Sequence, residues 1–397
     1  MSPSADSPIR QELRAKPDSF GRSERGGAGG AAQHPPHERA LYLDAFRGLM
    51  ALVMVQGHVM DTLLAPAALA ERLYVWQQML HGSTAPGFLF ASGFVVGLPP
   101  APLSLRAGLR RARRLLFVLA VGYYLHLPYL SLWKTLAAST SAERAAFFAC
   151  DALQVIAATQ LFVLGLQAIV GRRWTTWAGL LALAVVALTP LVWSSGVAAR
   201  LPEPIAPWLD ATTGSSFPVF PYSAFVLAGA LAGARLGRAP APVRQRREVA
   251  SGVLLLGGGA LLALVFHGRV DFWGPSPAYV LVRLGGLLLL LRLVEAAAAT
   301  GHWAVRELGL LGHETLLVYV LHLTLLFGGA FGPSPLTDLH GQLGFAGATL
   351  VLVVMIPVLL GAAWLWRTAK HRAPREARLL LLFVSVAFLY EFAVRPW

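Results

Sequence analysis

Long apolar stretches separated by short polar segments follow one another along the chain from Leu41 onward. An α-helix needs about 20 apolar residues to cross the hydrocarbon core of a bilayer, and these stretches are of that length. The pattern predicts an all-α fold, a polytopic transmembrane helical bundle of about eleven spans. The predicted spans are residues 42–64, 74–97, 111–128, 151–170, 174–193, 217–236, 249–266, 278–294, 308–327, 344–366 and 379–394.

Three of the predicted spans, 74–97, 217–236 and 308–327, are interrupted by polar, Gly or Pro residues. Lipid cannot satisfy free backbone hydrogen-bonding groups. Such interruptions are therefore tolerated only where the backbone is buried in protein or faces a cavity. We therefore expect a functional site close to these three spans.

Residues 1–39 differ from the rest of the chain. They are rich in Ser, Pro, Gly and mixed charge and have no apolar period, which predicts a disordered cytoplasmic tail. No apolar stretch of signal-peptide length precedes Leu41, so we expect no cleaved signal. Residues 40–397 form the predicted transmembrane domain.

The composition supports a membrane protein. Hydrophobic residues make up 56% of the 397 positions and charged residues 13%, about half the share usual in soluble domains. These values exclude a soluble enzyme, a secreted disulfide scaffold and a disordered chain. A single cysteine, Cys150, excludes an intramolecular disulfide and a Cys-cluster metal site, and no metal is expected.

The basic residues predict the orientation of the spans. The chain has 33 Lys and Arg against 20 Asp and Glu, for a net charge of +13. With the tail inside, 24 basic residues fall in inner segments and 6 in outer segments, as the positive-inside rule requires. This predicts a multi-pass protein of the cytoplasmic (inner) membrane, with its N-terminus inside and C-terminus outside. Basic clusters beside spans meet lipid headgroups, so we expect membrane lipid and no nucleic acid as a partner.

Four ionisable side chains are predicted on one face of the first span: Asp44, Arg47, His58 and Asp61. Asp44 and Arg47 are three residues apart and can pair. His58 follows Arg47 by eleven residues, or about 16 Å along the helix, on nearly the same face. Ionisable groups at bilayer depth are costly, which makes each a functional candidate. Asp44 and Asp61 can also be explained as interfacial residues, whereas His58 lies deeper.

A neutral histidine at the depth of His58 can act as a general base, with a carboxylate such as Asp61 fixing its tautomer. His81, at the outer side of the second span, can face the same cavity. We take His58, His81 and Asp61 as candidate catalytic residues.

Further polar residues lie within later spans. Arg283 is a deep cation that either binds an anionic group or pairs with a carboxylate, and we group it with Arg47 and Asp44 as a candidate cofactor-binding residue. Tyr319 and His322 are three residues apart and share a helix face. These two and Gln154 are candidate substrate-binding residues.

The first-span motif resembles that of the transmembrane acyltransferase superfamily, which includes the acyltransferase 3 proteins and the heparan-α-glucosaminide N-acetyltransferases. Arg47 and His58 have ten residues between them, Leu-Asp-Ala-Phe precedes Arg47, and Ser-Gly-Phe ends the next span. The resemblance covers about residues 40–395. Three later segments are similar to the glucosaminide branch: Asp151-Ala-Leu-Gln-Val-Ile-Ala, Phe217-Pro-Val-Phe-Pro-Tyr and Gly312-His-Glu-Thr-Leu-Leu-Val-Tyr-Val-Leu-His322.

The resemblance implies transfer of an acyl group, such as acetyl, from cytoplasmic acyl-CoA to a sugar amine or hydroxyl of an outer glycan. It also implies that Arg47 helps to hold the donor and that His58 is the base. The glucosaminide enzymes have an active histidine in the segment after their first span, which this chain lacks, and its nearest histidine is His81. His58 and His81 therefore both stay open as the base, with His58 favoured.

A secondary transporter that uses the polar stripe as an ion or proton path is the alternative function. Transporters often contain two related halves, and the first-span pattern has no second copy in the chain. The acceptor, the acyl chain length, N- versus O-acylation and the oligomeric state stay open, a homo-oligomer being one option.

Overall fold

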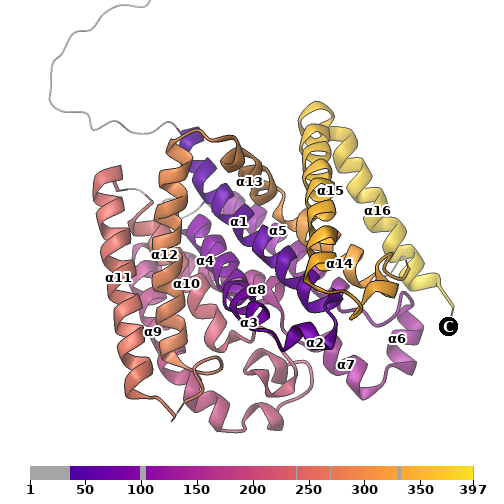
Figure 1. The fold of residues 1–397 in the computed structure, drawn as a ribbon, viewed down its shortest axis with the longest axis horizontal. Coiled ribbons are helices and arrows are strands. Elements are labelled where there is room, and N and C mark those ends of the chain that lie inside the picture. Colours follow the sequence, from indigo (N-terminus) through magenta and orange to yellow (C-terminus); the bar gives the residue numbers. More distant parts are fainter. Residues whose placement is uncertain (1–35, 99–103, 238, 269, 329–331, 397) are drawn as a thin grey trace, which may run out of the picture. The chain divides into compact units, whose positions relative to one another are not determined.

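A computed structural model of the protein describes residues 36–98, 104–237, 239–268, 270–328 and 332–396, with side chains described from residue 41 onward. Within these ranges the regular structure is helical, apart from one isolated bridge between Leu64 and Leu343 (Figure 1). The helices are α1 (Pro36–Leu63), α2 (Pro66–Leu69), α3 (Arg72–His81), α4 (Thr84–Gly97), α5 (Leu105–Leu125), α6 (Leu132–Ala138), α7 (Ser141–Phe148), α8 (Ala152–Val170), α9 (Trp174–Ser194), α10 (Val219–Arg235), α11 (Ala241–Val265), α12 (Pro277–Ala299), α13 (Trp303–His313), α14 (Thr315–Phe327), α15 (Phe345–Arg372) and α16 (Pro374–Val394).

The all-α prediction is confirmed, and helix covers nearly all of each of the eleven predicted spans. The predicted tail lies outside the described residues, except for residues 36–39, which belong to α1. α1 therefore begins before the first predicted span.

The three spans with interruptions are the three irregular ones in the structure. The second predicted span is divided into α3 and α4 at Gly82 and Ser83. The ninth is divided into α13 and α14, which meet at an angle of 80°. The sixth corresponds to α10, in which Phe220 has non-helical backbone angles.

By length and composition, five helical stretches among the described residues can cross a bilayer, or six if the bent pair α13–α14 is one span. One of them, Ala152–Ser194, has 43 residues. It consists of α8 and α9, joined by Gly171–Arg173 with Gly171 at a φ of +55°. Each helix is about 30 Å long at 1.5 Å per residue, so the stretch can hold the two spans predicted there. The total of eleven spans and the N-terminus-inside orientation stay predictions. The five stretches are Arg72–Gly97, Ala152–Ser194, Ala241–Val265, Phe345–Arg372 and Pro374–Val394.

Helix α1 is the centre of the bundle. It packs against α3, α4, α12, α13, α14 and α15, and its core-facing side chains are fully buried, for example Phe46, Ala51 and Val59. At the edges, α11 lies beside α12 and α15 beside α16 (Figure 1). Asp44, Arg47 and His58 on α1 are thus partly covered by protein, whereas Asp61 near the end of the helix is exposed.

Helices α4 and α10 approach each other closely through glycines. A Cβ on Gly93 would lie 2.0 Å from the Val226 carbonyl oxygen, and one on Gly229 would lie 2.1 Å from the Phe90 carbonyl oxygen. Only glycine fits there, as in the small-residue contacts typical of membrane helices. This contact holds α4, which lines the cavity described below, against α10.

We expect Gly93→Val to prevent assembly of the bundle, because its side chain would collide with backbone that cannot move independently. The cost should exceed the about 1–3 kcal/mol typical of overpacking a core. The matched control is Gly257→Val, also inside a helix, where a Cβ meets no atom within 4 Å. Thermal unfolding in detergent should show a large drop in midpoint for Gly93→Val and little change for Gly257→Val, and equal midpoints would contradict this interface.

Candidate active site

A cavity of about 1040 Å³ lies in the bundle, lined by residues of α1, α3, α4, α5, α8, α10, α12 and α14. Its volume is at the upper end of the roughly 300–1,000 Å³ usual for small-molecule sites. It lies beside the breaks in α3–α4 and α13–α14, as the interruptions in the sequence predict. The space suits a long ligand or two ligands bound together.

One face of α1 contributes Arg47, Met54 and His58 to this cavity. Their spacings of seven and four residues return to one side of an α-helix. Arg47 and His58 are about 16 Å apart along the axis, by the helical rise. Both residues line the cavity, in agreement with the prediction that they share one face of the helix.

Two histidines that are far apart in the sequence form a hydrogen-bonded chain. His322 is fully buried, and its Nδ1 lies 2.9 Å from the Val318 carbonyl oxygen. A carbonyl can only accept, so Nδ1 of His322 carries the proton and donates it. In a neutral ring Nε2 is then an acceptor, and it lies 2.9 Å from Nδ1 of His58.

This chain fixes the tautomer of His58. With both rings neutral, His58 donates through Nδ1 to His322, and its own Nε2 has a free lone pair. Nε2 has no hydrogen-bond partner among the described residues, and the side chain lines the cavity. His58 is therefore arranged to accept a proton from a bound molecule. The predicted partner of His58 was a carboxylate, whereas the observed one is His322.

His81 ends α3 and lines the same cavity beside His58, with the two ring centroids 5.2 Å apart. It fits there because the neighbouring position on α1 is Gly57, where a Cβ would lie 1.8 Å from His81 Nδ1. Nδ1 is buried without a hydrogen-bond partner among the described residues. Nε2 lies 3.7 Å from the Asp61 carboxylate.

Asp61 does not contact His58 in the interactions that the structure shows. Its carboxylate accepts hydrogen bonds from the Tyr74 hydroxyl, at 3.1 Å, and from the Gln78 side chain. Together with His81, these contacts join the end of α1 to α3. Asp61 thus influences the cavity by positioning α3 and His81.

A cluster of charged groups adjoins the other end of the cavity, and Arg47 is its member in the lining. Arg47 pairs with Asp44 at 3.4 Å, as predicted, and Asp44 also lies 3.7 Å from His313. Glu314, at the sharp bend between α13 and α14, accepts two hydrogen bonds from Lys370. The five side chains lie at ends of spans that the predicted topology puts on the inner side.

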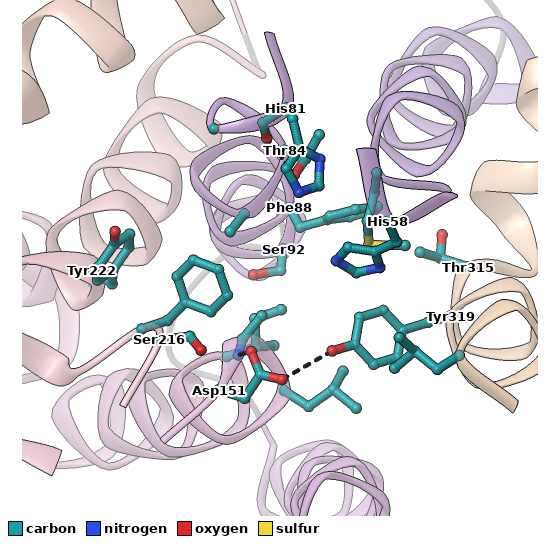
Figure 2. A pocket seen from close by; sticks show the side chains of 18 of the residues that line it. His58, His81, Thr84, Phe88, Ser92, Asp151, Ser216, Tyr222, Thr315 and Tyr319 are labelled. Carbon is teal, nitrogen blue, oxygen red and sulfur yellow. Dashed lines mark hydrogen bonds between the residues drawn. The ribbon is translucent and has the colours of Figure 1, made fainter. Parts of the chain in front are cut away.

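A second polar group faces the cavity from α8. Asp151 caps this helix by accepting from the Ala152 backbone amide at 2.7 Å. Its other oxygen accepts from the Tyr319 hydroxyl at 3.2 Å and lies 3.6 Å from His126 (Figure 2). Tyr319 also packs edge-on against His322. Tyr319 and His322 do share a face, but Tyr319 reaches the cavity and His322 supports His58 from behind.

Two candidate residues lie apart from the residues with which the sequence analysis grouped them. Arg283 is in the cavity lining but joins the His81 end, about three helical turns from Arg47. Gln154 is fully buried against Gly122 of α5 and does not line the cavity. Among the described residues no group of three or more His, Cys, Asp or Glu side chains could hold a metal ion.

Several cavity residues were not singled out from the sequence. Asp151 was named only within a segment similar to the glucosaminide branch, although an ionisable group beside a predicted span is itself a functional signal. Trp273 and Tyr279, just before and within α12, line the cavity next to Arg283. An aromatic pair flanking a buried cation was the available signal for these two.

The geometry places His58, whose Nε2 has no partner among the described residues, in a large cavity of a bundle of apolar helices. Comparison with protein families gives the class. Residues 40–367 match the acyltransferase 3 family, described as an acyltransferase domain, and the chain belongs to this family. It is thus an acyltransferase with multiple apolar helices, a multi-pass membrane protein. No curated protein matches the sequence.

Proposed function

We propose that this protein transfers an acyl group, most simply acetyl, from cytoplasmic acyl-CoA to a sugar amine or hydroxyl on the outer side of the membrane. The observation that carries the proposal is the position of His58. Its Nε2 has no hydrogen-bond partner in the described part of the chain, and its side chain lines a cavity that Arg47 also lines, about 16 Å away along α1. The protein would work in the cytoplasmic membrane.

The base and the donor would meet within the cavity. Arg47 holds the CoA part of the donor by charge, and the pantetheine arm extends along α1 so that the thioester carbonyl reaches His58. Charge-assisted hydrogen bonds from arginine suit the phosphates of CoA. Asp44 orients Arg47 through their 3.4 Å contact. No metal takes part in the proposed reaction.

The reaction is a direct acyl transfer. His58 Nε2 accepts the proton of the acceptor amine or hydroxyl while the acceptor nitrogen or oxygen attacks the thioester carbonyl carbon. The new C–N or C–O bond forms and the C–S bond breaks. The electron pair leaves with the CoA sulfur, and His58 returns the proton to give free CoA and acylated sugar.

A sugar acceptor agrees with the likeness of the later segments to the heparan-α-glucosaminide N-acetyltransferases. Purified protein in detergent, given acetyl-CoA with labelled acetyl and a panel of amino sugars and glycans, tests the proposal. We expect CoA release that depends on the sugar and label on the sugar. Movement of sugar or ions across proteoliposome membranes without CoA release would favour the transporter instead.

We expect Arg47→Gln to raise the KM for acetyl-CoA about tenfold or more, because a charge-assisted hydrogen bond contributes about 1.5–3 kcal/mol. The acceptor KM should stay within twofold. Arg306→Gln, which removes an exposed cation from the neighbouring α13, is the control. Steady-state kinetics with each substrate varied in turn measures both constants, and an unchanged acetyl-CoA KM would remove Arg47 from the donor site.

A further inference from the structure

Arg283 lines the cavity and is held by two hydrogen bonds. Its Nη1 donates to the Met79 carbonyl at 2.9 Å and to the Ser83 hydroxyl. Both acceptors flank His81 at the break between α3 and α4. No carboxylate pairs with Arg283 among the described residues, although the predicted explanations included one.

The Tyr279 hydroxyl also hydrogen-bonds the guanidinium, so the described partners of Arg283 are a carbonyl and two hydroxyls, none of which carries a negative charge. Nε and Nη2 form one edge of the planar group, and this edge is the one that binds carboxylates and phosphates through two parallel hydrogen bonds. Nη2 lies close to Gly82, where a Cβ would come within 3.2 Å of this nitrogen. Arg283 is thus held by neutral groups, and no carboxylate among the described residues neutralises its charge.

Aromatic rings surround this cation. The guanidinium carbon lies 5.5 Å from the ring centroid of Trp273 and 5.4 Å from that of Tyr279. Trp273 is 53% exposed although it lines the cavity, so one part of its indole is open to a ligand. Tyr222 and Ser216 also line the cavity, on the side opposite Tyr319 (Figure 2).

Flat aromatic faces next to polar groups suit a sugar ring, whose C–H faces stack on indole while its hydroxyls find donors and acceptors. The cation adds a requirement for negative charge. We propose that Arg283 and Trp273 form the acceptor site and select an anionic sugar, one that carries a carboxylate or a phosphate. This inference rests on the proposed function. The site adjoins His81 and, through it, His58.

Direct binding without acyl-CoA tests the acceptor site separately from the reaction. Calorimetry would compare glucose with glucuronate and glucosamine with glucosamine 6-phosphate, so that the two pairs separate carboxylate from phosphate. We expect the purified protein to bind at least one anionic sugar about tenfold or more tighter than the counterpart that lacks the anionic group. Equal affinities within both pairs would overturn the proposal, even if the protein turns over acyl-CoA.

Two variants should lose affinity in different ways. Arg283→Gln should abolish the preference for the anionic sugar. Trp273→Ala should weaken the anionic and neutral sugars by a similar factor, because stacking does not depend on the charge. Arg200→Gln and Trp303→Ala, both exposed and outside the cavity, are the matched controls. A charge preference that survives in Arg283→Gln would overturn the assignment of Arg283.

Because Arg283 also braces the α3–α4 break, each variant needs a folding check by size-exclusion chromatography. If Arg283→Gln does not fold, Arg283→Lys takes its place. Lysine keeps the charge but not the two-pronged edge, so we expect a reduced preference for the anionic sugar. If Arg283→Lys kept the full preference for the anionic sugar, recognition through two parallel hydrogen bonds would be contradicted. Selective sugar binding without acyl-CoA turnover would refute the proposed function and leave the sugar site standing.

Discussion

His58→Ala is expected to lower acyl transfer by about 10²–10⁴-fold, the usual contribution of a general base. The KM for acetyl-CoA should change little, because Arg47 and not His58 holds the CoA part of the donor. The variant should fold, since His58 is only partly buried and removing it leaves one unpaired lone pair on His322. CoA release in detergent and thermal unfolding measure the two properties on the same sample.

The control is His267→Ala, which removes an exposed histidine outside the cavity and should keep full activity. His81→Ala separates the two candidate bases. We expect it to lose less activity than His58→Ala, because Nε2 of His81 is 3.7 Å from Asp61 and its Nδ1 is covered by α1. A larger loss for His81→Ala would reverse the assignment of the base.

The sequence was sufficient to predict features that depend on neighbours in one helix. Apolar length predicts the helices, and the spacing between Arg47 and His58 puts both on one side of α1. The three interrupted spans coincide with the irregular helices around the cavity. These features are local, because a helix has a fixed period and a break in apolar pattern needs a buried or cavity-facing backbone.

Contacts between distant segments had no such signal. His58 and His322 are 264 residues apart, and no spacing rule connects them. Nη1 of Arg283 donates to a backbone carbonyl and a hydroxyl, and any residue sequence supplies backbone carbonyls. The polar side chain of Gln154 suggested a contact with the substrate, yet it packs against Gly122 inside the bundle. Which face of a helix borders a cavity depends on the packing of the other helices.

His322→Leu is expected to reduce turnover by about 10²–10³-fold, although His322 does not line the cavity. Without the Nε2 acceptor of His322, nothing holds the proton of His58 on Nδ1. The proton can then move to Nε2 of His58, where it occupies the lone pair that acts as the base. Loss of a tautomer-fixing partner costs up to about 10⁴-fold in serine proteases, where the partner is a carboxylate. A neutral imidazole should have a smaller effect. The acetyl-CoA KM should stay unchanged, and kcat should fall.

His322→Gln distinguishes a positioning role from a structural one. The glutamine carbonyl can accept from Nδ1 of His58, so we expect it to recover at least tenfold of the activity that leucine loses. Both variants fill a fully buried site, and leucine also leaves the Val318 carbonyl without its donor, so both should lower the unfolding midpoint. If His322 were only structural, kcat per folded molecule would be normal in both variants. Equal kcat values for leucine and glutamine would therefore exclude the positioning role, because only a group that accepts from His58 can set its tautomer.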